Sequence, residues 1–399
     1  MPFSSILSQR LQIQRDQHCF RSLNYRKGVD FASNDYLGFS EDPVLKRRIL
    51  EIFRENCIPL GSAGSRLLRG ELEVFEESEK ILADFCGRET AVIYASGYQA
   101  NVGLLSSLLR AGDCVFSDEA NHASIIDGIR LSGAHRSVYP HCDLKALRRL
   151  LEQSRETRIQ DQGGPQYRAD SLRVIVTESL FSMDGDIAPL VELTQLAREF
   201  SALLVVDEAH ATGLWGDFES KKGGGLVQSL GLSDQVFATI HPAGKAMGLG
   251  GAWVCGDLLL KEYLVNFSRS FIFSTAPLPL LPLCLVQSVN YWKEKGIDRA
   301  HQVLERASRF QDLLREAVKD SLSIPPVSGQ IIPLIVGNNL RSLEVAQEVQ
   351  QLGFDVRAIR PPTVPEGRSR LRIAVNWSQT EGDYERFIGI MKQIASRYI

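Results

Sequence analysis

Short apolar runs alternate along the chain with longer segments of helical periodicity. The runs are continuously apolar and rich in β-branched residues, which is typical of strands buried on both faces of a sheet. They lie at 90–96, 113–117, 172–179, 202–209, 235–240 and 252–256. Helical patterns separate them, for example at 72–87 and 190–202. This alternation predicts an α/β domain with a mainly parallel sheet.

The pattern changes near residue 275. Two long helical segments follow, and then strands and helices alternate at 331–337, 342–353, 354–359 and 370–375 before a final helix. We therefore expect three parts: an N-terminal arm at 1–43, a large domain at 44–275 and a smaller α+β C-terminal domain at 276–399.

Three further segments have distinct patterns. Residues 3–17 predict an amphipathic helix, which we expect to pack as an arm on a dimer. The polar stretch 152–171 predicts a solvated surface loop, and the glycine-rich stretch 216–225 predicts a flexible loop.

Composition narrows the class of protein. Among 399 residues, 45 are Lys or Arg and 48 are Asp or Glu, so the net charge is -3. This balance argues against a protein that binds nucleic acid or a membrane surface. No apolar run approaches the length of about 18 residues that a membrane span needs, and the N-terminus does not resemble a signal peptide. We therefore expect a cytoplasmic protein.

The seven cysteines are scattered and never form a CxxC pair. An odd number of isolated cysteines indicates reduced thiols rather than a disulfide framework or a zinc site. The sequence therefore predicts no metal site.

A group of ionisable residues follows the apolar run at 202–209. Asp207 and Glu208 end this run, and His210 comes soon after. Ligands bind at the carboxyl ends of strands in open α/β sheets, although such a carboxylate can also simply cap a helix. The DEAH tetrapeptide also occurs in nucleic-acid motor ATPases. That class needs a phosphate loop of the pattern G-x-x-x-x-G-K-[ST]. The nearest segment, Thr239–Ala246, has threonine in place of the first glycine of this pattern and alanine in place of the hydroxyl residue after the lysine.

Lys245 follows the run at 235–240 and is surrounded by glycine and other small residues. Small neighbours allow a planar partner to approach the amine, and a partly desolvated lysine can act as a Schiff-base nucleophile. A solvated loop lysine is the alternative interpretation.

Two other strand ends offer complementary groups. Ser96, Gly97 and Tyr98 precede a helical pattern, where free N–H groups bind anions, although glycine is also common between a strand and a helix. His122 could stack on an aromatic ligand, or it could be a packed side chain beside a capping Asn121. Together, the four features match the needs of pyridoxal 5'-phosphate: a Schiff-base lysine, an acid, a stacking ring and phosphate donors.

Longer motifs in the same order resemble the α-oxoamine synthases, a family of fold-type-I pyridoxal-phosphate enzymes. The likeness extends over about residues 30–399. It is carried by SNDYLG (33–38), GSAGSRLLRG (61–70), ASGYQAN (95–101), NHASIIDG (121–128), TESLFSMDGDIAPL (177–190), VVDEAHATG (205–213), GKAMGLGGAWV (244–254) and IRPPTVPEGRSRLRIAV (359–375). The resemblance implies a large domain with a mainly parallel, seven-stranded type of sheet flanked by helices.

The resemblance also implies a role for each matching residue. The catalytic residues would be Lys245, which binds the cofactor and moves the Cα proton, Asp207 at the pyridinium nitrogen, His122 on the ring face and His210 beside the phenolic oxygen. Further cofactor contacts would come from Ser96, Gly97, Tyr98, Ser182, Ser274 and Thr275, the last two reaching the phosphate of the partner subunit. Arg372, with Asn34 nearby, would bind the carboxylate of the amino acid.

The IRPPTVP segment is similar to the version found in the biotin-pathway members of the family. It implies a decarboxylating condensation of L-alanine with a pimeloyl thioester of CoA or of a carrier protein, in a homodimer with shared active sites. Two alternatives remain: a sister enzyme that uses glycine or serine with another acyl-CoA, and a non-catalytic relative.

The sequence departs from the family pattern at two positions. Pro242 stands where the family commonly has a phosphate-binding threonine, and proline has neither a hydroxyl nor an N–H group. The phosphate would lose one ligand there, unless Thr239 or His241 replaces it. Phe75 stands where the family has a histidine.

Overall fold

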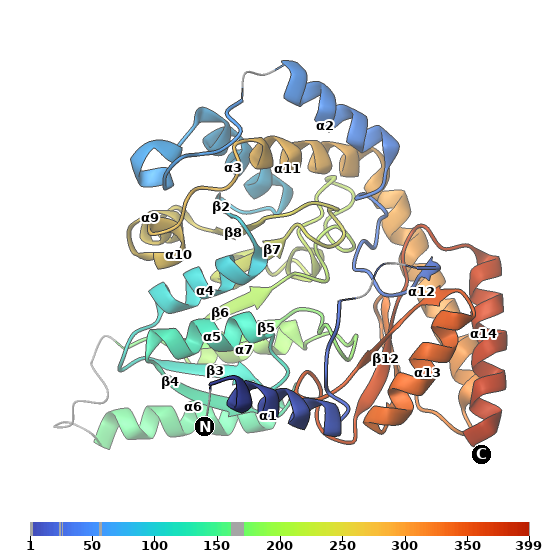
Figure 1. Ribbon diagram of the computed structural model, residues 1–399. Coiled ribbons are helices and arrows are strands. Elements are labelled where there is room, and N and C mark those ends of the chain that lie inside the picture. The colour runs from blue at the N-terminus through green and yellow to red at the C-terminus, as the bar shows by residue number, and fades with distance from the viewer. Residues whose placement is uncertain (1–2, 24, 26, 56–57, 161–170, 399) are drawn as a thin grey trace. The chain divides into compact units, whose positions relative to one another are not determined.

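The computed structural model describes residues 3–23, 25, 27–55, 58–160 and 171–398. The chain divides into two compact units (Figure 1). The large unit comprises residues 37–181 and 187–301, and the small unit comprises residues 1–36, 182–186 and 302–399.

A seven-stranded sheet forms the centre of the large unit. Its strands, in chain order, are β2 (Thr90–Tyr94), β3 (Cys114–Asp118), β4 (His135–Tyr139), β5 (Arg173–Glu178), β6 (Leu203–Asp207), β7 (Ala238–Pro242) and β8 (Ala252–Gly256). The spatial order is β2-β8-β7-β6-β5-β3-β4, and only β8 runs antiparallel to its neighbours. The prediction of a mainly parallel sheet is therefore confirmed.

The predicted apolar runs all coincide with strands, whereas β4 was not predicted. This strand forms an edge of the sheet, and most of its side chains are exposed or only partly buried. An edge strand does not need two apolar faces, so it has no continuous apolar run.

Helices flank this sheet. They are α2 (Pro43–Glu55), α3 (Glu73–Phe85), α4 (Gly97–Leu108), α5 (Ala123–Ser132), α6 (Leu144–Gln160), α7 (Leu190–Glu199), α8 (Leu226–Ser229), α9 (Leu258–Phe267), α10 (Arg269–Ile272) and α11 (Leu280–Tyr291). The π-helical segments η1 (Arg66–Gly70) and η3 (Trp292–Gly296) and the 3-10 turn η2 (Ser233–Gln235) complete this unit. The helices α4 and α5 lie side by side (Figure 1). Their apolar faces form one core with Val115, Val205, Ile240 and Val254 of the sheet.

Two loop predictions for this unit need correction. Residues 152–160 belong to α6, because Leu147 and Leu151 are spaced one turn apart and are fully buried; positions 161–170 lie outside the described residues. The segment 216–225 forms turns as predicted, but its last three glycines are buried. The backbone of Gly225 lies against Glu208, which accepts the N–H groups of Leu226 and Val227 at 3.1 and 2.7 Å.

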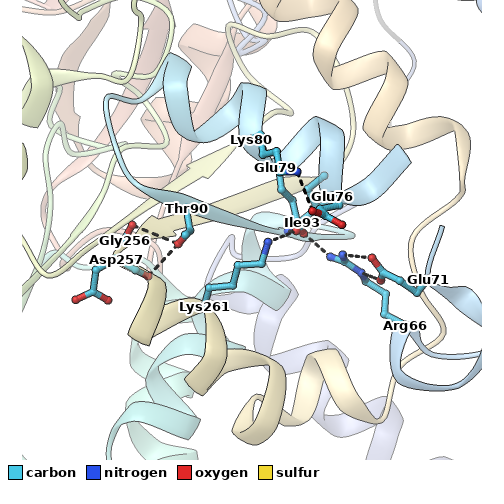
Figure 2. A network of polar contacts seen from close by, with 10 residues as sticks. All are labelled: Arg66, Glu71, Glu76, Glu79, Lys80, Thr90, Ile93, Gly256, Asp257 and Lys261. Atoms are coloured by element: carbon cyan, nitrogen blue, oxygen red, sulfur yellow. Dashed lines mark hydrogen bonds and ion pairs between the residues drawn. The ribbon is translucent and has the colours of Figure 1, made fainter. Parts of the chain in front are cut away.

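A network of polar contacts around the buried Arg66 and Glu79 joins η1, α3, β2 and α9 (Figure 2). Arg66 bonds to both Glu71 and Glu79, and Lys261 donates to Glu79 at 2.9 Å. The guanidinium of Arg66 also lies 4.5 Å from the ring centroid of Phe75, which is fully buried. Phe75, at the position of the family histidine, is therefore part of the packing beneath the GSAGSRLLRG segment.

The small unit has an α+β architecture. Strands β9 (Ile331–Gly337), β11 (Arg357–Ile359) and β12 (Ser369–Ala374) form an antiparallel sheet, and β1 (Val29–Asp30) pairs in parallel with β10 (Phe354–Asp355). The helices are α1 (Phe3–Asp16), α12 (Ile297–Val318, shared with the large unit), α13 (Asn339–Gln351) and α14 (Glu381–Ala395), followed by the short turn η4 (Ser396–Tyr398). The prediction of a helix over 3–17 is confirmed, and α1 has no buried residue.

The boundaries of the two units differ from the domains expected from the sequence. Residues 276–301 lie in the large unit, because α11 packs against α2 and α3. Residues 1–36 lie in the small unit, where β1 pairs with β10. Among the described residues, no helix is long and apolar enough to cross a membrane.

Candidate active site

Asp207 lies at the carboxyl end of β6, near the middle of the large sheet. Its side chain is 3% exposed. Asn101 Nδ2 donates to Oδ2 at 2.7 Å, and the Ala209 N–H donates to Oδ1 at 2.9 Å. These two donors hold the carboxylate in one orientation, and its role as a ligand-binding acid at a strand end stays a prediction.

His122 follows β3 and caps the N-terminus of α5. Its ring Nδ1 accepts the Ser124 N–H at 3.3 Å and lies 2.8 Å from Ser124 Oγ. An Nδ1 that accepts a backbone N–H has a lone pair, so the neutral ring carries its proton on Nε2. Burial, together with the positive charge of Lys245, lowers the pKa of His122 despite the opposing charge of Asp207. The residue still has an exposed surface, so a neutral ring is available to a planar partner.

Lys245 lies in a tight loop between β7 and β8. The loop is closed by hydrogen bonds from Ala243 N–H to the Gly251 carbonyl (2.9 Å) and from Gly248 N–H to the Lys245 carbonyl (2.9 Å). Gly248 has φ +69°, and an added Cβ would lie 2.5 Å from the Ser40 nitrogen, so this position requires glycine. Lys245 is partly buried, and its charge acts on both His122 and Glu178. The structure therefore gathers Lys245, Asp207 and His122 in one place.

Glu178, which the sequence did not single out, ends β5 directly beside Asp207 of β6. Residues paired in this way point to the same face of a sheet. Glu178 is 2% exposed, accepts the N–H of His122, and has one oxygen, Oε1, without a partner among the described residues. Burial and then the charge of Asp207 raise the pKa of Glu178 to about 8. A neutral carboxyl group thus belongs to the site. The sequence did contain a sign of this residue: Glu178 is an acid near the end of an apolar run, as Asp207 is in the run at 202–209.

The N-terminus of α4 is the position at which the sequence predicts an anion site. Ser96 caps this helix by accepting the Gln99 N–H at 3.2 Å, and both Ser96 and Tyr98 are exposed. Within the described part of the chain, no group accepts the N–H of Gly97 or Tyr98. The first N–H groups of a helix bind anions, and a phosphate fits here.

Pro242 packs against this helix start: a Cβ on Gly97 would lie 2.6 Å from Pro242 Cγ. Thr239 and His241, the two residues that could replace the missing threonine hydroxyl, form hydrogen bonds with other buried side chains. Thr239 and His241 are buried and lie 2.8 Å apart (Oγ1 to Nε2), and His241 Nδ1 lies 2.9 Å from Thr212 Oγ1. The expectation that one of them replaces it is therefore wrong.

Ser274 lies beside the same helix start, because Gln99 Nε2 donates to its hydroxyl at 3.1 Å. Thr275 is exposed. Their predicted reach to a partner subunit stays a prediction.

Arg372, on β12, is the centre of a second group of predicted residues, in the small unit. Its Nη2 donates to Asn34 Oδ1 at 2.8 Å, and its Nε donates to the Ser182 carbonyl at 2.6 Å. Arg372 is 6% exposed, and its Nη1 makes no hydrogen bond within the described residues. A nearly buried guanidinium with unused N–H donors suits a carboxylate ligand. Ser182 therefore groups with Arg372 and Asn34, whereas His210, which is 4% exposed, belongs to the large unit.

These groups fit a bound pyridoxal phosphate: an amine, an oriented carboxylate, an accessible neutral ring and free helical N–H groups. The fold and the site fit one class of protein, the fold-type-I enzymes that depend on pyridoxal phosphate.

Comparisons with known proteins give the family. The profile of "Aminotransferase class I and II" matches residues 26–389. An 8-amino-7-oxononanoate synthase from Lysinibacillus sphaericus is 38% identical over 372 residues, covering 93% of this chain and 90% of that protein. The chain belongs to the family of 8-amino-7-oxononanoate synthases, pyridoxal-phosphate-dependent acyltransferases, within the class I and II aminotransferases.

Solved structures agree with this assignment. The 8-amino-7-oxononanoate synthase of Francisella tularensis has a TM-score of 0.75 at 26% identity and covers 93% of this chain and 99% of that chain. A serine palmitoyltransferase from Sphingomonas wittichii has a TM-score of 0.84 at 24% identity, covering 99% and 97%, and at this identity it supports the fold alone.

Proposed function

We propose that the protein catalyses the decarboxylating condensation of L-alanine with a pimeloyl thioester of CoA or a carrier protein. The products are 8-amino-7-oxononanoate, the free thiol and CO2, and the reaction is a step in biotin biosynthesis. The observation that carries the proposal is the 38% identity, over nearly the full length, to a protein named 8-amino-7-oxononanoate synthase. The cluster of Lys245, Asp207 and His122 supports it with the required chemical groups.

Bound pyridoxal phosphate supplies an electron sink for negative charge at the substrate Cα. In the proposed mechanism, Lys245 Nζ holds the cofactor and later moves the Cα proton. Asp207, fixed by Asn101 and the Ala209 N–H, holds the proton of the ring nitrogen. His122 would cover one face of the ring, and His210 would lie beside the phenolic oxygen, as the family resemblance implies.

The cofactor phosphate is proposed to bind at the start of α4. The N–H groups of Gly97 and Tyr98 and the Ser96 hydroxyl would be its donors. Because Pro242 offers neither a hydroxyl nor an N–H group, this site relies on the helix more than the usual family site does.

Substrate L-alanine is proposed to bind through its carboxylate to Arg372. The hydrogen bonds from Arg372 to Asn34 and to the Ser182 carbonyl use Nη2 and Nε, so Nη1 is left to pair with the substrate. The planar guanidinium fixes the direction of the carboxylate, and thus of the Cα–H bond.

Exposed apolar side chains support a homodimer with shared active sites. Large apolar side chains of the large unit are 61 to 83% exposed, namely Leu60, Leu68, Leu259, Phe273 and Leu278. A second copy would cover such side chains and bring Ser274 and Thr275 to the partner's phosphate.

The six described cysteines have free thiols, as expected for the cytoplasmic location that we propose.

One assay tests the proposed reaction. The protein is incubated with L-alanine, glycine or L-serine, each with pimeloyl-CoA, pimeloyl carrier protein or palmitoyl-CoA, and the products are identified by mass spectrometry. We expect 8-amino-7-oxononanoate from L-alanine with a pimeloyl thioester, and the two pimeloyl arms identify the carrier. Product from glycine or serine, but not from L-alanine, would show a sister activity. An absorption spectrum tests the other alternative: a protein that shows no visible band after addition of cofactor would be a non-catalytic relative.

A further inference from the structure

A cluster of two thiols and an imidazole lies in the large unit, outside the proposed active site. Cys86 follows α3, His241 lies in β7 and Cys255 lies in β8. One donor atom from each lies within 4.8 Å of the others. The three residues are 3%, 0% and 0% exposed, so the cluster is closed to solvent.

The register of the sheet separates this cluster from the active site. In the antiparallel pair β7–β8, Thr239 is opposite Cys255 and His241 is opposite Trp253. Paired residues share a face and successive residues alternate, so these four side chains point to one face. Asp207 pairs with Ile240 and therefore points to the other face.

We propose that Cys86, His241 and Cys255 form a buried binding site for a thiophilic closed-shell cation, Cu(I) or Zn(II), bound by two thiolates and one imidazole. Sulfur and imidazole donors select such soft or borderline cations over Mg²⁺ and Ca²⁺, which prefer oxygen. No carboxylate belongs to this donor set.

The surroundings of His241 fix which nitrogen can bind a metal. The Thr212 hydroxyl donates to the Glu208 carbonyl at 2.9 Å, so its oxygen must accept the proton of His241 Nδ1, also at 2.9 Å. This leaves the lone pair on Nε2, the form in which histidine ligates metals. Thr239 Oγ1 lies 2.8 Å from Nε2, and its hydroxyl would turn away or become a further ligand.

Trp253 holds the other donors in place. Its indole N–H donates to Cys86 Sγ at 3.2 Å, and its ring stacks on His241 with centroids 5.5 Å apart and an angle of 14°. A hydrogen bond to sulfur stabilises the thiolate that a metal needs, and the stacked ring limits rotation of the imidazole. The site would join α3 to β7 and β8, the strands that bracket the Lys245 loop.

The test starts with the wild-type holoenzyme, produced in medium with added zinc or added copper and purified under reducing conditions. We expect about one metal ion per chain to survive extensive dialysis in one of the two arms, which identifies the cation. X-ray absorption should show sulfur at about 2.3 Å and nitrogen at about 2.0 Å if zinc is bound. A protein without metal in both arms, a metal with oxygen and nitrogen neighbours only, or a Cys86–Cys255 disulfide would overturn the proposal.

Variants assign the ligands. Cys86→Ser and Cys255→Ser should lose the metal, whereas Cys114→Ser, which changes a buried thiol outside the cluster, should keep it. Thr212→Val should weaken binding by about 10-fold, because it releases the oriented imidazole. Circular dichroism checks that each variant is folded. Retention of the metal by both folded cluster variants would contradict the assignment, and the wild-type measurement holds even if a variant does not fold.

Discussion

The buried carboxyl pair Glu178 and Asp207 makes a quantitative prediction about stability and pH. The pKa of Glu178 is about 8, against an ordinary value of 4.5. The shift of about 3.5 units corresponds to about 5 kcal/mol, since one unit is about 1.4 kcal/mol. Between these two pKa values the folded state keeps a proton that the unfolded state has lost. The stabilising contribution is therefore complete below pH 4.5 and is lost as the pH rises through 8.

Glu178→Gln should remove this dependence, because glutamine has nearly the same shape and does not titrate. Unfolding free energies of the cofactor-free wild type and variant are measured in urea at intervals from pH 5 to pH 9. Relative to the variant, the wild type should lose several kcal/mol over that range, up to about 5.

A control variant and a second signal sharpen this comparison. Glu192→Gln, on an exposed position of α7, should leave the wild-type profile unchanged. Infrared spectra should show a protonated carboxyl band at pH 6 that is absent from Glu178→Gln. Parallel profiles for wild type and Glu178→Gln, within about 1 kcal/mol, would refute the argument that burial beside Asp207 keeps Glu178 neutral.

Three further predictions concern the proposed active site. Lys245→Ala should abolish turnover and the visible absorption of the bound cofactor; normal turnover with an unchanged spectrum would show that another residue holds it. Arg372→Lys should raise KM for L-alanine by about 10-fold or more with a smaller change in kcat, because an ammonium group cannot replace the planar guanidinium with its paired N–H donors. Steady-state kinetics measure both constants, and Arg368→Lys, at an exposed position, is the control. Pro242→Thr should tighten cofactor binding by about 10-fold in a fluorescence titration, since a hydrogen bond to a charged group contributes about 1.5 kcal/mol or more. Equal affinities of Pro242→Thr and Pro242→Ala would show that the missing hydroxyl is not what limits binding.

The sequence determined the large sheet and much of the site. Central strands are buried on both faces and must be apolar along their whole length, so their runs were visible without any tertiary information. Parallel strands end at one edge, so the ends of three runs were enough to predict that Lys245, Asp207 and His122 would gather. Motif order then indicated the family, which the comparisons confirmed.

Contacts between distant segments decided the rest, because pairing register and packing depend on residues far apart in the chain. Register alone places Glu178 beside Asp207 and turns His241 and Thr239 to the opposite face, where they cannot replace the phosphate ligand missing at Pro242. The edge strand β4 has no apolar run, and the pairing of β1 with β10 assigns the N-terminal residues to the small unit. The sequence alone thus determined which central strands are buried on both faces and that Lys245, Asp207 and His122 follow or end such strands. The tertiary structure decided which of these groups are neighbours, since a one-residue change in register would turn each side chain to the other face of the sheet.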